Sequence, residues 1–143
     1  MKKYFAAAAL LLGLVACGGH NDAKLDGRNW KLASMDGIPA QAIDGEADYF
    51  TLEFTAADMS VAGRTNCNRF FGKYKTDGRK LDFENLGMTR MACPDMQYED
   101  AFVKMLDEVD RYEIHGSELT LYDDSKKLAT FRSADADKGA HRK

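Results

Sequence analysis

The chain has 143 residues, of which 45% are hydrophobic and 30% charged, and its formal net charge is -3 at pH 7. This length suffices for one domain with a sizeable core and is too short for two. The mild acidity gives no electrostatic reason to expect nucleic-acid binding, so we predict no nucleic-acid partner.

The N-terminus predicts a secretory signal peptide over residues 1–16. Lys2 and Lys3 precede an apolar run of about a dozen residues, which is shorter than the roughly 20 residues of a membrane-spanning helix. An uncleaved membrane anchor is the alternative. The sequence Leu-Val-Ala-Cys that ends at Cys17 resembles the lipobox of bacterial lipoproteins, in which the cysteine is lipidated. The resemblance to Gram-negative lipoproteins implies, because Gly18 and not aspartate follows the cysteine, that the domain is lipid-anchored at the outer membrane, on its periplasmic or surface side.

Two polar segments flank the predicted domain, which covers residues 25–132. Residues 17–24 have no apolar side chain larger than alanine after the cysteine, so they bury too little surface to offset the entropy of ordering. We predict a lipidated flexible tether there. Residues 133–143 are polar and end in basic residues, which predicts a disordered tail.

The first half of the domain alternates polar and apolar residues, as half-buried strands do. The clearest case is 49–54, where every second residue is Phe or Leu. Residues 38–48 show no regular period and predict a long connection in which function could lie. The predicted strands are 28–35, 49–54, 59–63 and 70–74.

The second half of the domain predicts one helix and four more strands. Pro94 fits the first helical position, and acidic residues follow it near the positive end of the helix dipole. Asp77-Gly78 predicts a hairpin between strands 70–74 and 80–83. The helix has an apolar stripe made of Tyr98, Ala101, Phe102, Met105, Leu106 and Val109. The remaining predicted strands are 111–114, 119–122 and 128–132.

These elements predict an α+β fold. We expect an antiparallel sheet of about eight short strands, curled toward a partial barrel, with one amphipathic helix packed on it. We also expect a monomer. The predicted core consists of Phe50, Leu52, Phe54, Phe102, Leu106 and Leu121.

Two cysteine-containing segments organise the chain. Residues 65–74 read TNCNRFFGKY, and residues 86–94 read LGMTRMACP. The asparagines and glycine predict a tight turn, in which Asn66 and Asn68 adopt left-handed backbone angles. Together the segments resemble the META domain of the HslJ heat-shock lipoproteins, whose pattern is Cys-Asn-Arg, then Gly-x-Tyr, then Thr-Arg-Met-x-Cys. The resemblance spans residues 25–131, although family members usually have glycine where this chain has Asn66.

Cysteine usage predicts one disulfide bond. If Cys17 carries lipid, Cys67 and Cys93 remain as an even pair in an oxidising compartment. In the loop-entropy model, closing about 27 residues contributes roughly 3.5 kcal/mol to stability. Two buried free thiols are the alternative, because spacing alone cannot show that the two α-carbons approach closely enough.

The sequence predicts no enzymatic activity, no cofactor and no metal. It has no Cys-x-x-Cys for thiol redox chemistry and no Gly-x-Ser-x-Gly for nucleophilic hydrolysis. Zinc binding would need Cys67, Cys93, His115 and a further ligand, which is not a recognised spacing. The other histidines, His20 and His141, lie in the predicted tether and tail.

Four residues beside the cysteines are candidates for binding: Asn66, Asn68, Arg69 and Arg90. A disulfide would bring the two arginines onto neighbouring turns, where they could contact an anionic ligand. In the alternative interpretation, each guanidinium pairs with local carbonyl groups or with a carboxylate such as Glu99.

The resemblance implies a noncatalytic module held at the membrane through Cys17, which supports envelope integrity in stress through an envelope protein partner. One alternative is a binder of small apolar ligands or lipids, with a pocket inside the curled sheet. Another is an inhibitor of a host or periplasmic enzyme, with residues 38–48 as its contact. A well-packed interior favours the first function, and a ligand-sized apolar cavity favours the second.

Overall fold

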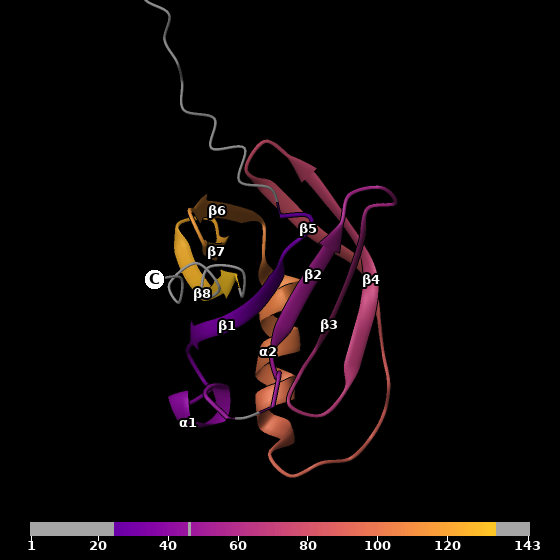
Figure 1. The fold of residues 1–143 in the computed structure, drawn as a ribbon, viewed down its shortest axis with the longest axis vertical. Coiled ribbons are helices and arrows are strands. Elements are labelled where there is room, and N and C mark those ends of the chain that lie inside the picture. Colours follow the sequence, from indigo (N-terminus) through magenta and orange to yellow (C-terminus); the bar gives the residue numbers. More distant parts are fainter. Residues whose placement is uncertain (1–24, 46, 134–143) are drawn as a thin grey trace, which may run out of the picture.

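A computed structural model describes residues 25–45 and 47–133 as a ring of eight antiparallel strands with two helices (Figure 1). Each strand pairs with the next, and β8 pairs with β1. The predicted α+β class is confirmed. The strands are β1 (Asn29–Met35), β2 (Thr51–Thr55), β3 (Ser60–Arg64), β4 (Arg69–Asp77), β5 (Lys80–Met88), β6 (Arg111–His115), β7 (Glu118–Asp123) and β8 (Lys126–Ser133).

The predictions for the two ends of the chain lie outside the described residues. They are the signal peptide at 1–16, the tether at 17–24 with lipidated Cys17, and the tail from residue 134 onward. Ser133, the first residue of the predicted tail, is buried and belongs to β8. In the described part of the chain, no helix has the length and apolar character needed to cross a membrane.

The ring is uneven because β5 and β6 pair only through Lys80 and Arg111. The other neighbouring strands pair over three to seven residues. Helix α2 (Met96–Glu108) connects β5 to β6, in place of the hairpins that join most other neighbours. Figure 1 shows α2 behind β1 and β2, between the β4 side of the molecule and β6–β8.

Helix α2 supplies an aromatic residue to the centre of the core. The Phe102 ring lies 5.4 Å from that of Phe50, 6.0 Å from that of Phe70 and 6.1 Å from that of Phe131, measured between centroids. All six predicted core residues are at most 3% exposed, which confirms the strand and helix periods used to choose them. Burial of this apolar surface is the main force holding the ring closed.

Three local predictions are wrong. A short helix, α1 (Ala40–Ile43), lies in the segment predicted as an irregular connection, where buried Ile38 and Ile43 hold it against the core. Helix α2 begins at Met96, two residues after Pro94, because Asp95 has a left-handed backbone with φ 63° and the helix starts after it. The third wrong prediction is that Asn66 and Asn68, in the turn before Phe70, have left-handed backbone angles. Among described non-glycine residues, positive φ occurs at Phe50, Met59, Asn85, Asp95 and Asp124, and not at either asparagine of that turn.

Candidate functional site

The two cysteine segments meet at one end of the ring. A disulfide joins Cys67, between β3 and β4, to Cys93, before α2, and the two α-carbons are 5.8 Å apart. This distance lies in the usual range for disulfides. We call residues 65–69 and 89–95 the disulfide corner.

A threonine hydroxyl shapes the turn in the disulfide corner. Thr65 Oγ1 accepts hydrogen bonds from the backbone N–H of Cys67 (3.0 Å) and of Asn68 (2.9 Å). Thr65 N–H donates to the Asn68 carbonyl at 2.8 Å. Side-chain oxygens of Ser and Thr can satisfy backbone donors in this way without positive φ. The turn therefore depends on Thr65, and the left-handed angles predicted for its asparagines do not occur.

Glu99 of α2 contacts the turn at residues 65–68 from the inside of the protein and is only 7% exposed. Its Oε2 accepts from the Thr65 hydroxyl, from Asn68 N–H at 3.2 Å and from Asn68 Nδ2 at 3.1 Å. A buried carboxylate needs several donors to offset its lost hydration, and the turn supplies them. The alternative in which Glu99 pairs with Arg69 or Arg90 is therefore wrong.

The Asn68 side chain joins the turn to the irregular segment that follows β5. Its Oδ1 accepts from Thr89 Oγ1 at 3.0 Å and from Met91 N–H at 2.7 Å, while Nδ2 donates to the Met91 carbonyl at 3.1 Å. Asn66 Nδ2 donates to the Asp95 carbonyl at 3.0 Å. The disulfide, the Glu99 carboxylate, the Asn68 side chain and the Asn66 side chain therefore all hold the disulfide corner together.

The predicted binding residues divide into buried and exposed sets. Asn68 is 1% exposed and fully hydrogen-bonded, so its role is structural, and Asn66 is partly buried. Arg69 and Arg90 are exposed, and neither guanidinium forms a hydrogen bond or ion pair with the described residues. The arginines are therefore the accessible part of the predicted site.

Sequence reasoning missed two features at or beside the disulfide corner. One is the buried support from Thr65 and Glu99. Glu99 lies three residues before Phe102, which places it on the apolar side of α2, and that position was the available signal. The other is a pair of exposed apolar side chains, Phe71 (59%) and Met91 (60%). Alternation places Phe71 opposite buried Phe70, so its exposure could have been predicted, whereas Met91 lies outside any regular element.

A second polar cluster surrounds Glu113 on β6. Arg111 Nη1 donates to Glu113 at 2.7 Å and holds the pKa of that carboxyl below its ordinary value. Tyr122 donates to the same carboxylate at 3.2 Å, and burial together with this hydrogen bond raises the pKa of Tyr122. Such pairs near the surface contribute little to stability. Among the described residues, no group of three or more His, Cys, Asp or Glu could hold a metal ion.

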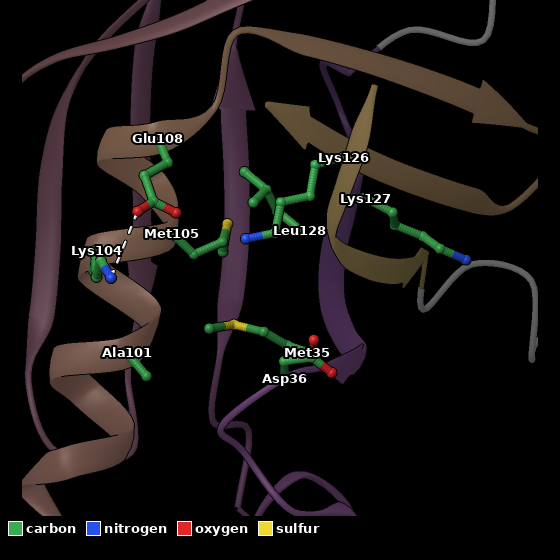
Figure 2. Close-up of a pocket in the computed structure, with 9 residues that line it drawn as sticks. All are labelled: Met35, Asp36, Ala101, Lys104, Met105, Glu108, Lys126, Lys127 and Leu128. Atoms are coloured by element: carbon green, nitrogen blue, oxygen red, sulfur yellow. Dashed lines mark ion pairs between the residues drawn. The ribbon is translucent and has the colours of Figure 1, made fainter. Parts of the chain in front are cut away.

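Two surface grooves carry charged side chains. Figure 2 shows the first, of about 220 Å³ between α2 and the ends of β1 and β8, where Lys104 and Glu108 form an ion pair at 3.7 Å. The second, of about 300 Å³, lies beside the β4–β5 hairpin and is lined by Lys75, Lys80 and Asp82 among others. Ligand pockets typically measure about 300–1,000 Å³ and are mostly apolar. The first groove is smaller than this range and the second lies at its lower end, and both are open at the surface, so neither is an enclosed apolar-ligand cavity.

The chain is similar to known proteins in both sequence and structure. A family model described as META domain matches residues 23–135. Heat shock protein HslJ from Escherichia coli (strain K12) is 27% identical over 143 residues, covering 94% of this chain and 98% of the relative. The NMR structure of a protein from Burkholderia xenovorans aligns with a TM-score of 0.63 and 27% identity, covering 77% of this chain and 83% of that one. A duf4847 family protein from Bacteroides vulgatus shares only the fold, with a TM-score of 0.56 and 16% identity over 76% of this chain and 93% of that one.

Proposed function

This chain belongs to the META domain family, and from that membership we propose that it is a noncatalytic lipoprotein of the outer membrane. In this proposal, lipid on Cys17 anchors the domain, which supports envelope integrity during heat stress by contacting an envelope protein partner. The similarity to a protein named for heat shock supports the stress role. The signal-like N-terminus supports the anchoring.

The observation that carries the proposal is the placement of the disulfide corner relative to the start of the domain. Asp26 lies beside the end of β2, where it bridges Phe54 and accepts a hydrogen bond from Ala56 N–H at 2.8 Å. The disulfide corner follows the opposite end of β3, where Arg64 pairs with Arg69. Figure 1 likewise shows the β5–α2 connection far from the tip of β2. A domain tethered near Asp26 would present the disulfide corner away from its anchor, toward a partner.

The interior favours this function over the binding of an apolar ligand inside the ring. Trp30, Phe102 and Phe131 are each 0% exposed and fill the space that a ligand would need. The segment expected to act as an inhibitory loop is held to the core through Ile38 and Ile43, which limits its use as a free contact. Neither alternative gains a specific observation in its favour.

The anchoring is tested by replacing the proposed lipidation site. We expect Cys17→Ala to accumulate as unacylated precursor and to fail to restore growth at high temperature in a strain that lacks the protein. Mass spectrometry of the N-terminal peptide measures the acylation, and membrane fractionation measures the location.

Gly18→Asp is the matched control for the anchoring test. It keeps the lipidated cysteine, so we expect acylated protein that stays in the inner membrane. Normally acylated, correctly located Cys17→Ala protein would contradict the proposed anchor. Full rescue of growth by that variant would contradict the need for the anchor.

A further inference from the structure

We propose that the outer surface at and beside the disulfide corner is a docking surface for an acidic segment of a partner protein that also carries apolar side chains. We call this the docking surface and define it by Arg69, Phe71, Arg90 and Met91. The proposal rests on the proposed function, because it names the surface and the partner chemistry that the function requires.

The β4 residues of the docking surface share one face of the sheet. Phe70 is buried, so its neighbours Arg69 and Phe71 point outward. Phe71 pairs with Gly87, and a Cβ added at Gly87 would lie 3.2 Å from the Phe71 ring. The ring therefore lies across the glycine and remains exposed on its outer side.

The remaining residues lie directly after the end of β5 at Met88. Thr89 pairs with Arg69 through two hydrogen bonds, Thr89 N–H to the Arg69 carbonyl at 2.9 Å and Arg69 N–H to Thr89 Oγ1 at 3.0 Å. Arg90 and Met91 come next. Met91 lies four positions after Gly87, a span of at most about 14 Å, which is short enough for Phe71 and Met91 to belong to one contact area.

Exposure at the docking surface is unusual for this chain. Among the described residues, Phe71 and Met91 are the large hydrophobic side chains that remain exposed. Single exposed apolar residues are common on protein surfaces. Two that lie at or beside the disulfide corner, together with two arginines, have the composition of an interface core, which is enriched in aromatic residues, Met and Arg.

Charge identifies the partner as acidic. Some other cations of the domain form ion pairs, such as Lys73 with Asp58 and Arg111 with Glu113. Lys126 and Lys127 form none with the described residues, so the docking surface is distinguished by two arginines that accompany exposed apolar side chains. Arg69 and Arg90 have no such partner in the described part of the chain, although the whole chain has a net charge of -3. Guanidinium groups bind carboxylates through paired hydrogen bonds. Complementary charge would therefore steer and orient an acidic segment on this surface.

The backbone beneath the docking surface is already ordered. The backbone N–H and carbonyl of Met91 both form hydrogen bonds with the side-chain amide of Asn68. Two residues further along the chain, Cys93 is fixed by the disulfide. Binding to a preorganised backbone does not lose the entropy of ordering a loop. The docking surface can therefore bind with few contacts.

Photo-crosslinking of the full-length protein in living cells tests the proposal. Phe71→p-benzoylphenylalanine is compared with Lys127→p-benzoylphenylalanine, an exposed site on β8. We expect a protein adduct from position 71 alone, whose crosslinked peptide is rich in Asp and Glu with interspersed apolar residues. Combining Arg69→Glu with Arg90→Glu should reduce the adduct about tenfold, whereas Lys126→Glu should leave it unchanged. An adduct with a basic segment or with lipid, or one that survives the charge reversal, would overturn the proposal.

A second measurement separates docking from anchoring. Purified full-length protein in detergent micelles is titrated with a fluorescent peptide of Glu-Leu-Asp-Phe repeats and with a Lys-Leu-Lys-Phe counterpart. We expect saturable binding of the acidic peptide only, weakened about tenfold by the double arginine variant and by high salt. Equal binding of both peptides, or none of the acidic one, refutes the docking surface whether or not Cys17 is lipidated. Mislocalisation in cells with intact peptide binding refutes only the proposed function.

Discussion

Replacing Glu99 with alanine is expected to lower the free energy of unfolding by about 2–3 kcal/mol. The change removes a buried acceptor that binds Thr65 and Asn68 through several hydrogen bonds. Hydrogen bonds to charged groups contribute about 1.5–3 kcal/mol each. The total stays below their sum because the Thr65 hydroxyl can turn to the Asn68 carbonyl, 3.3 Å away, and because the buried charge is also removed. Urea unfolding of the purified domain measures the difference.

Two variants are controls for the Glu99 prediction. Glu99→Gln keeps the shape and one acceptor oxygen, but it places an amide donor near the donor Asn68 Nδ2, so an intermediate loss is expected. Asp100→Ala removes the neighbouring carboxyl group, which is exposed, and should change stability by less than about 0.5 kcal/mol. Similar losses for the alanine variants at positions 99 and 100 would show that the buried network does not stabilise the domain.

Most regular elements of the fold follow from local periodicity. Alternation in Phe50, Leu52 and Phe54 identified β2, and the stripe through Phe102 and Leu106 identified α2. These patterns are decisive because a strand or helix with one buried face must repeat apolar residues at its own period. The class and the core were therefore predictable from sequence.

Features set by contacts between distant segments were not predictable. Closure of the ring depends on the pairing of β1 with β8, whose residues are about a hundred positions apart. Strand β5 continues to Met88, past the alternating segment, because β4 pairs with it across a register shift. Helix α2 also begins later than predicted, because Asp95 adopts a left-handed backbone conformation. The Asp95 carbonyl accepts a hydrogen bond from Asn66 Nδ2. Local propensity contains none of this information.

The candidate site also has a part that the sequence could predict and a part that it could not. The cysteine pair and the two arginines could be identified from residue type and position. Burial of Glu99 contradicts the usual preference of glutamate for the surface. Its position on α2 places it on the apolar side of the helix, but only the hydrogen bonds from the turn explain why a carboxylate is tolerated there. Proteins hold surface groups in place with such buried polar support, which links the network under the turn to the docking surface above it.

The disulfide should contribute more to stability than Glu99 does. The double variant Cys67→Ser, Cys93→Ser is expected to lose about 2–4 kcal/mol, because the bond closes a loop with a sequence separation of 26 residues. For a domain of this size, the melting temperature should fall by roughly 10 °C. Thermal and urea unfolding of variant and parent measure the loss. A thiol titration of the unfolded, unreduced parent tests whether Cys67 and Cys93 are bonded, and two reactive thiols would contradict the bond.

Combining the cysteine changes with Glu99→Ala gives a sharper test, because both contacts fix the turn at residues 65–68 relative to the start of α2. Once the disulfide is absent, the turn can separate from α2, so removing Glu99 should have less effect. We expect the triple variant to lose less than the sum of the separate losses, by about 0.5 kcal/mol or more. Simple additivity would show that the bond and the carboxylate act independently. An unchanged melting temperature in the double cysteine variant, together with a lost envelope phenotype, would instead assign the bond a redox role.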